Sequence, residues 1–240
     1  MTDLYMIRHA EIQPIRDFVR DEGLSPLGKV QAQRLRDRLA GTGEIKADVL
    51  ISSPLPRARQ TAEIIAPVLG LEPIFASEIE EMRSGEAYGL PREEFERRYP
   101  EVDHEMDPFQ RLAPGAENLG EFLLRVAGAL ERITHQYEGK TLVLVCHGGV
   151  IDSSLVYFFK MGWPTVPSTQ LYIQNTGITH WQKNSNKQGK AVWKLRRYND
   201  IMHLYDIGTR GRIHWNELAA GPVTDGQRFD DAVELEDASE

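Results

Sequence analysis

The stretch LYMIRHA at residues 4–10 sets the fold that we expect, because four apolar residues run directly into a charged pair. A short apolar run is typical of a buried strand, and the change to Arg8 and His9 marks its end. A second run, LVLVCHGG at residues 142–149, has the same form and reaches His147. Since strand carboxyl ends in an open α/β sheet face a common crevice, we predict one site that contains both histidines.

Helix and strand signals alternate along the rest of the chain. Ser25 followed by Pro26 is a helix start signal, and apolar positions then repeat at helical spacing until Gly41. The clearest helical period covers residues 119–133. Further helices are expected at 56–69, 92–98 and 150–159, and further strands at 49–51, 73–75, 171–174 and 192–198. This order predicts an α/β fold, a three-layer α/β/α sandwich around a mostly parallel mixed sheet.

Composition and charge exclude several classes of protein. The chain has 240 residues, 41% of them hydrophobic, as expected for one large or two small globular domains. Its net charge of −8 argues against nucleic-acid binding, which usually needs a basic face. We find no targeting segment and no apolar run near the roughly 18 residues of a membrane span. The single cysteine, Cys146, excludes an internal disulfide, so we expect a cytoplasmic protein without membrane or nucleic-acid partners.

The acidic charge is concentrated at the end of the chain. From Asp225 to Glu240 there are seven acidic residues and one basic residue, so this segment carries −6 of the −8. Such a composition is not expected to pack as a core. We therefore expect a single domain over residues 1–205, followed by an acidic tail over 206–240. A loop-rich insertion at 76–117, punctuated by glycine and proline, would carry substrate specificity.

Two arginines and two histidines are expected around the crevice. Guanidinium groups such as those of Arg8 and Arg57 bind phosphate oxygens bidentately. Backbone N–H groups at Gly148, where a helix opens, add further donors. Arg57 also stands at a helix start, where the helix dipole disfavours a cation unless an anion is close. Together with His9 and His147, these residues predict a pocket for a phosphate dianion.

The same residues predict chemistry at phosphorus. A neutral imidazole is a competent nucleophile when a hydrogen bond holds its other nitrogen, so one histidine can accept the phosphoryl group. The second histidine, protonated, would stabilise the negative transition state. A carboxylic acid must protonate the leaving oxygen and then activate water, a role we assign to Glu81, with Glu80 as the alternative. We expect no metal and no other cofactor, because the arginines and the imidazolium already neutralise the phosphate and no acidic cluster with ligand spacing lies beside either histidine motif.

Several motifs, in this order, resemble those of the histidine phosphatase superfamily, the group that contains the cofactor-dependent phosphoglycerate mutases. They are RHAE at 8–11, LSPLG at 24–28, SPLPRA at 53–58, HGG at 147–149, and a closing segment with ND at 199–200 and HL at 203–204. The resemblance implies a phosphoglycerate mutase-like fold in which His9 is the phosphorylated nucleophile. It also implies that Arg8, Arg57 and His147 bind the phosphate and that Glu81 is the proton donor.

The chain departs from the family pattern at two positions. Ala10 stands where the family has glycine, and Ile15 stands where many members have asparagine, so that phosphate contact is missing or supplied by Gln13. The segment between Glu81 and His147 is also short for a glycolytic mutase. We therefore favour a phosphatase of the histidine acid type, a metal-independent phosphomonoester hydrolase that acts on a small phosphorylated metabolite. A phosphomutase and a non-catalytic phospholigand-binding protein are the alternatives, and the sequence leaves the substrate and the oligomeric state open.

The remaining histidines and loop arginines receive no catalytic role. His203 is expected to support the pocket from behind, and Cys146 to be a small core residue. Arg83 and Arg111 could contact a second anionic group of the substrate, but a solvated position is the favoured interpretation. The histidines expected at the surface are His104, His135, His180 and His214.

Overall fold

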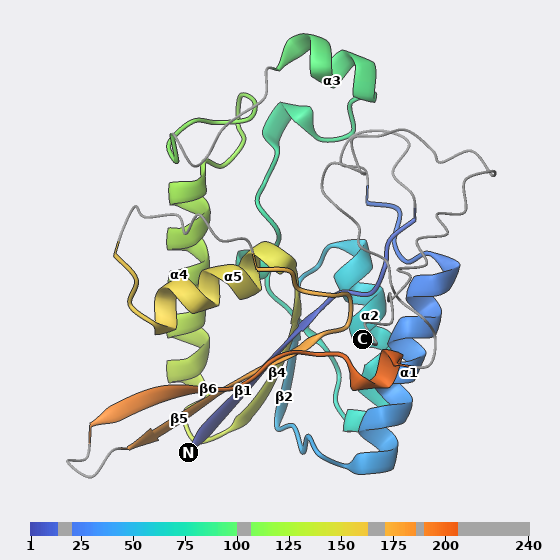
Figure 1. Ribbon diagram of the computed structural model, residues 1–240, viewed down its shortest axis with the longest axis vertical. Helices are drawn as coiled ribbons and strands as arrows, with labels where there is room; N and C mark the ends of the chain where they lie inside the picture. The colour runs from blue at the N-terminus through green and yellow to red at the C-terminus, as the bar shows by residue number, and fades with distance from the viewer. Residues whose placement is uncertain (14–20, 100–106, 163–170, 186–189, 206–240) are drawn as a thin grey trace, which may run out of the picture. The chain divides into compact units, whose positions relative to one another are not determined.

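A computed structural model describes residues 1–13, 21–99, 107–162, 171–185 and 190–205 (Figure 1). These residues form a six-stranded sheet with the order β3-β2-β4-β1-β5-β6. The strands are β1 (Thr2–Arg8), β2 (Val49–Ser52), β3 (Ile74–Phe75), β4 (Thr141–Cys146), β5 (Ile178–Ser185) and β6 (Ala191–Asp200). The first four strands in the sheet order pair in parallel, whereas β5 and β6 are antiparallel, so the predicted mixed and mostly parallel sheet is confirmed.

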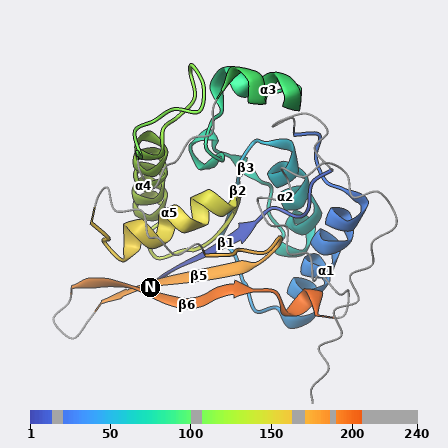
Figure 2. The same ribbon diagram turned by 45° about the horizontal axis from the view of Figure 1, so that its top comes forward.

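Helices cover both faces of the sheet (Figure 2). They are α1 (Pro26–Thr42), α2 (Pro56–Leu69), α3 (Arg92–Arg98), α4 (Leu119–Gln136) and α5 (Gly148–Phe158), with 3-10 turns η1 (Ser77–Ile79), η2 (Gly85–Ala87) and η3 (Met202–Leu204). Helices α1 and α2 pack on one face, and α4 and α5 pack on the other. The three-layer α/β/α sandwich that the sequence predicts is therefore present.

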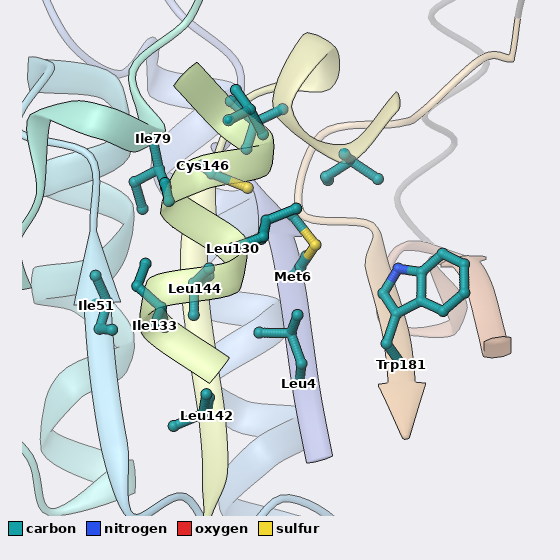
Figure 3. Packing of buried hydrophobic residues seen from close by; sticks show 14 of the residues in the cluster. Leu4, Met6, Ile51, Ile79, Leu130, Ile133, Leu142, Leu144, Cys146 and Trp181 are labelled. Carbon is teal, nitrogen blue, oxygen red and sulfur yellow. The ribbon is translucent and has the colours of Figure 1, made fainter. Parts of the chain in front are cut away.

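The two central strands are buried on both sides, which explains their unbroken apolar runs. Leu4 and Met6 of β1 belong to the cluster with α4 and α5, whereas Tyr5 and Ile7 belong to the cluster with α1 and α2. Figure 3 shows the first cluster, in which residues of β1, β2 and β4 lie behind those of α4. Such burial on both faces fixes the direction of each strand and hence the position of the residue that follows it.

The start signal of α1 acts as the sequence predicts. The side chain of Ser25 accepts a hydrogen bond from the N–H of Gly28, and Pro26 occupies the first turn of α1. Helix α4 begins with a full capping box, in which Asn118 and Glu121 satisfy each other's backbone N–H groups. No helix in the described part of the chain is both long and apolar enough to cross a membrane.

The predicted strand at 171–174 is wrong, because β5 begins later, at Ile178. The side chain of Asn199 takes the place of a neighbouring strand there: its Oδ1 accepts from the N–H of Gln174, and its Nδ2 donates to the carbonyl of Tyr172. Backbone groups satisfied by a distant side chain leave no signal in the local pattern. The proposed acidic tail at 206–240 lies outside the described residues.

Candidate functional site

His9 and His147 follow β1 and β4 directly, and these two strands are neighbours in the sheet. Their register pairs Arg8 with Cys146, so the two histidines stand next to each other one position later. The N–H of His9 donates to the carbonyl of Cys146 at 2.9 Å, and the ring centroids are 5.2 Å apart. His9 is 6% exposed and His147 is 0% exposed. The structure thus brings together the two imidazoles that the sequence predicts to share one site.

The ring of His9 is held in one tautomer. Its Nδ1 lies 2.7 Å from the carbonyl oxygen of Ala10, and since a carbonyl can only accept, Nδ1 carries the proton and Nε2 keeps its lone pair. Burial lowers the pKa of His9 well below its usual range, and the charges of Arg57 and Arg8 lower it further. The side chain of Asn175 donates to the backbone carbonyl of His9 at 2.9 Å. His9 is therefore a neutral, oriented imidazole with a free nitrogen.

His147 has the opposite tautomer. Its Nδ1 accepts from Nε of Arg57 at 3.2 Å, so its proton is on Nε2, which donates to Oγ of Ser53 at 2.8 Å. Burial lowers the pKa of His147 well below the usual range, and the positive charges of Arg57 and Arg8 act in the same direction. These surroundings do not support the expectation of a protonated His147, because a buried cation beside two guanidinium groups is unfavourable.

Arg57 lies in the first turn of α2 and has an anionic partner that the sequence did not identify. Its Nη1 contacts Oδ2 of Asp21 at 2.9 Å, and its backbone N–H lies 3.3 Å from the same oxygen. The Asp21 side chain is only 2% exposed. An anion was expected here from the helix dipole, but nothing in the pattern around Asp21 marks it as that anion.

Arg8 reaches beneath the start of α5. Its Nη1 donates to the carbonyl of Ile173, whereas its Nε is buried without a hydrogen-bond partner. A Cβ atom at Gly148 would lie 3.9 Å from this Nε, so the guanidinium group and the first residue of α5 are neighbours. Arg8, Arg57 and the open N-terminus of α5 therefore bring anion-binding groups to the two histidines.

Glu81 reaches the same helix terminus from the loop after η1. Its Oε2 accepts from the N–H of Gly149 at 3.2 Å, and its Oε1 accepts from the N–H of Met82 at 3.1 Å. Arg125 of α4 holds the loop by donating to the carbonyls of Glu80 and Glu81 at 3.0 and 3.2 Å. A carboxyl group is thereby fixed at the start of α5.

Glu80, the alternative proton donor, has a different environment. Its carboxylate lies 3.1 Å from Nε of Arg83, and that arginine is largely exposed. Of the two candidates, Glu81 is therefore the one whose carboxylate contacts α5.

The sequence profile of the histidine phosphatase superfamily (branch 1) matches residues 4–200. The chain belongs to this superfamily. It is 28% identical over 205 residues to the Bacillus subtilis protein named uncharacterized phosphatase PhoE, covering 85% of this chain and 97% of that protein. It is 30% identical over 215 residues to phosphoglycerate mutase-like protein 4 of Arabidopsis thaliana, covering 86% and 88%.

The fold is shared with solved structures, one of which is named a phosphatase. A phosphoserine phosphatase from Entamoeba histolytica, solved with 3-phosphoglyceric acid, superimposes with a TM-score of 0.64 at 27% identity and covers 85% of this chain and all of that one. The YhfR protein of Bacillus stearothermophilus superimposes with a TM-score of 0.67 at 22% identity. The phosphoglycerate mutase-like fold expected from the motifs is thus present in this superfamily member.

Other predicted residues lie away from the site or support it indirectly. Arg83 and Arg111 are exposed and pair with Glu80 and Glu121. Gln13 donates to the carbonyl of Leu24, so its amide has a structural partner. Burial raises the pKa of the Cys146 thiol, consistent with the expected core position.

The structure contradicts the surface position predicted for His180 and agrees with the supporting position predicted for His203. His180, expected at the surface, is 8% exposed; its ring stacks on Tyr5 and its Nε2 lies 2.8 Å from Oδ1 of Asp3. The sequence missed this because β5 pairs with β1 and so brings His180 beside Tyr5. His203 contacts Oγ1 of Thr176 at 2.9 Å, behind the strand end of Arg8. His135 is exposed, and His104 and His214 lie outside the described residues.

The sequence did not identify three residues that lie near the candidate site. Asp21 and Ser53 bond to the phosphate-binding candidates, and Asp152 of α5 lies within electrostatic range of Arg8 and Glu81. Ser53 lies in a family motif, which is a signal that could have found it. Within the described ranges, no group of three or more His, Cys, Asp or Glu side chains is arranged to hold a metal ion.

Proposed function

We propose that this superfamily member is a phosphomonoester hydrolase of the histidine acid phosphatase type, acting without a metal on a small phosphorylated metabolite. The observation that carries the proposal is the tautomer of His9. Its Nδ1–H is hydrogen-bonded to the carbonyl oxygen of Ala10, which leaves the lone pair on Nε2. Arg57 and Arg8 act electrostatically on His9, and the ring of His147 lies 5.2 Å from its ring, so groups suited to binding a phosphate are close to it. A neutral histidine in such a setting is suited to attack phosphorus.

The reaction has two in-line steps. Nε2 of His9 forms a bond to phosphorus while the ester P–O bond breaks, and Glu81 gives its proton to the leaving oxygen. Water then attacks the phosphohistidine, Glu81 accepts a proton from it, and the P–N bond breaks to release phosphate and restore His9. The donors of Arg8, Arg57, His147 and Gly148 would stabilise the charge on the transferring group.

The incoming phosphate also changes the charge balance around His147. A dianion beside its ring would offset the guanidinium charges that lower the pKa of His147. We propose that His147 donates a hydrogen bond to the phosphate, or becomes protonated beside it, only when the substrate is bound. This retains the predicted role for a ring whose own surroundings lower its pKa.

A phosphomutase is the second candidate, favoured by the similarity to phosphoglycerate mutase-like protein 4. In that reaction the phosphohistidine returns its phosphoryl group to the rearranged substrate instead of to water. Measurement of isomer formation together with phosphate release from phosphorylated metabolites separates the two. Release of phosphate as the main product is expected here.

The test uses a generic aryl phosphate in the presence of EDTA, with His9→Ala as the variant and His135→Ala, at an exposed position, as the control. The wild-type protein and the control should release phosphate and form an acid-labile phosphoenzyme. His9→Ala should lose at least about 10³-fold in kcat and show no phosphoenzyme, since it lacks the nucleophile. Activity that needs added divalent metal, or an adduct on another residue type, would overturn the mechanism.

A further inference from the structure

The peptide group between His9 and Ala10 is hydrogen-bonded on both sides by side chains from distant parts of the chain. Its carbonyl, that of His9, accepts from Nδ2 of Asn175 at 2.9 Å. Its N–H, that of Ala10, donates to Oγ1 of Thr61 at 3.0 Å. Asn175 precedes β5, and Thr61 belongs to α2. Because a peptide group is planar, a group held at both its N–H and its C=O cannot rotate without losing a hydrogen bond.

This peptide group lies next to the carbonyl that orients the proposed nucleophile. The carbonyl oxygen of Ala10 accepts the Nδ1–H of His9 at 2.7 Å, which leaves the lone pair on Nε2. The direction of that carbonyl depends on the two backbone dihedrals of Ala10, and hence on how the preceding peptide plane is held. Side chains that fix the plane therefore also fix the acceptor of the imidazole proton.

The hydroxyl group of Thr61 is set up to accept. It has one proton, which Oγ1 donates to the carbonyl of Arg57 at 2.7 Å, so its lone pairs are left for the N–H of Ala10. Thr61 and Ala10 are both 0% exposed. Without the hydroxyl group, the N–H of Ala10 would be buried away from water, and such an N–H favours a rearrangement of the backbone.

Asn175 is held in place by a strained turn beside the end of β1. The N–H of Thr176 donates to the carbonyl of Arg8 at 3.0 Å, and the carbonyl of Gly177 accepts from the N–H of Arg8 at 3.3 Å. Thr176 has a φ of 57°, in the left-handed region that β-branched residues rarely adopt. Its hydroxyl donates to the carbonyl of Asn175 at 2.7 Å and accepts from Nε2 of His203 at 2.9 Å. Strain of this kind persists where the surroundings enforce it, and it occurs mostly at functional sites.

We propose that Thr61 and Asn175 are positioning residues for the nucleophile. By holding the His9–Ala10 peptide group from both sides, they keep the carbonyl of Ala10 on Nδ1 of His9 and keep Nε2 unprotonated. Both act through the backbone, by way of Ala10. The proposal rests on the proposed function, in which Nε2 of His9 attacks phosphorus.

The first variant is Thr61→Val, because valine matches the shape of threonine but cannot accept a hydrogen bond. With an aryl phosphate as substrate, kcat should fall by at least about 10-fold, since a misdirected catalytic group is costly. KM should stay within about threefold, because the guanidinium groups that bind the phosphate are unchanged. Thr61→Ser keeps the hydroxyl group and should restore kcat to within about threefold of the wild-type value.

Thr134→Val is the matched control for this change. Thr134 is a buried threonine of α4, and its hydroxyl also donates to a backbone carbonyl one turn earlier, that of Leu130, at 2.7 Å. It lies near the opposite end of α4 from Phe122, the residue that is close to Gly149. Thr134→Val should therefore leave kcat and KM unchanged.

Asn175→Ala tests the other side of the peptide group. It should lower kcat with little change in KM, and Asn184→Ala, on β5 with its amide bonded to Gln182, is the control. Because Thr61 and Asn175 act on the same peptide group, the loss in the double variant should be smaller than the product of the two single losses. Single losses that multiply in full would contradict a shared action.

A second measurement detects the orientation of His9 without catalysis. Nitrogen NMR of ¹⁵N-labelled histidine rings distinguishes a protonated ring nitrogen from one with a lone pair, and His9→Ala identifies the signals of His9 by their loss. The wild-type protein and Thr134→Val should show the Nδ1–H tautomer. Thr61→Val and Asn175→Ala should show a mixture of tautomers. A purely structural role would lower the thermal unfolding temperature and leave these signals in place.

The outcomes separate the two proposals. If the wild-type protein releases no phosphate from any phosphomonoester, the proposed function fails, and the NMR signals still test the orientation of the ring. If the wild-type protein is active and Thr61→Val either keeps its kcat or loses it with the tautomer of His9 unchanged, the positioning role is overturned and the proposed function stands. A lower kcat at similar KM, rescue by serine and a mixture of tautomers support the positioning role.

Discussion

At the residue scale, the site depends on hydrogen bonds that assign each nitrogen its role. The guanidinium group of Arg57 makes two of them, because its Nε fixes the tautomer of His147 while its Nη1 is held by Asp21. Lysine would keep one positive charge but has a single nitrogen and cannot make both contacts. The arginine is therefore required for its shape as well as for its charge.

Arg57→Lys should lower kcat/KM by about 10²-fold, as expected when a preorganised donor to the transferring group is lost. The measurement is steady-state hydrolysis of an aryl phosphate at neutral pH. Arg59→Lys, two positions later on α2 at an exposed ion pair with Glu63, is the matched control and should stay within about twofold. Equal effects of the two substitutions would contradict the assignment of Arg57.

At the element scale, Gly149 at the start of α5 has no space for a side chain. A Cβ atom at Gly149 would lie 2.4 Å from Oε1 of Glu81 and 3.0 Å from the ring of Phe122. The glycine is thus needed for the close approach of the loop after η1, and its φ is not in the left-handed region. The helix, the loop and α4 are packed around this one contact.

Gly149→Ala should reduce kcat by at least about 10-fold, because Glu81 must move away from the helix terminus and misplaced catalytic groups are costly. Gly128→Ala on α4 is the control, since its Cβ would meet nothing within 4 Å. That change should leave kcat unaltered and raise stability by roughly 0.5–1 kcal/mol through helix propensity. Kinetics and thermal unfolding of both variants check the expectation, which fails if Gly149→Ala is fully active.

The elements themselves were largely predictable from the sequence. Ser25 and Pro26 mark the start of α1, and the unbroken apolar runs mark β1 and β4, because these signals are local and strong. The strand at 171–174 was wrong and β5 was placed too early. The backbone of residues 171–174 is hydrogen-bonded to the side chain of Asn199 instead of to a strand. This contact joins two distant segments, so no local sequence pattern predicts it.

At the scale of the whole molecule, buried histidines make stability depend on pH. Burial, followed by the charge of Arg38, lowers the pKa of His203 to about 4. Because this lies below the unfolded value of about 6.5, the stabilising contribution is full above pH 6.5 and is lost as the pH falls to 4. Mild acid should therefore weaken the fold.

For His203 alone the loss between pH 6.5 and pH 4 is expected to be up to about 3 kcal/mol. His203→Gln, whose amide can still reach Thr176 but does not titrate, should show a flatter dependence of the unfolding free energy on pH in this window. Denaturant unfolding at several pH values measures it. Parallel curves for the two proteins would show that His203 does not titrate as expected.

The proposed division of the chain can be tested by truncation. We expect a protein that ends at Tyr205 to fold and to keep kcat/KM within about threefold, because the site residues and both apolar clusters come from the described residues before that point. Circular dichroism, thermal unfolding and hydrolysis of an aryl phosphate compare the two forms. Loss of folding or of activity would assign residues 206–240 a part in the domain.

The sequence by itself determined the layers of the fold and the meeting of Arg8, His9 and His147. This was possible because the local sequence marks where a buried strand ends, and neighbouring parallel strands place those ends at one edge of the sheet. Only the tertiary structure decided the ion pair of Asp21 with Arg57 and the tautomers of the two histidines. These depend on which side chains from distant segments share a space that excludes water, and charge and hydrogen bonding in that space follow from all of them together.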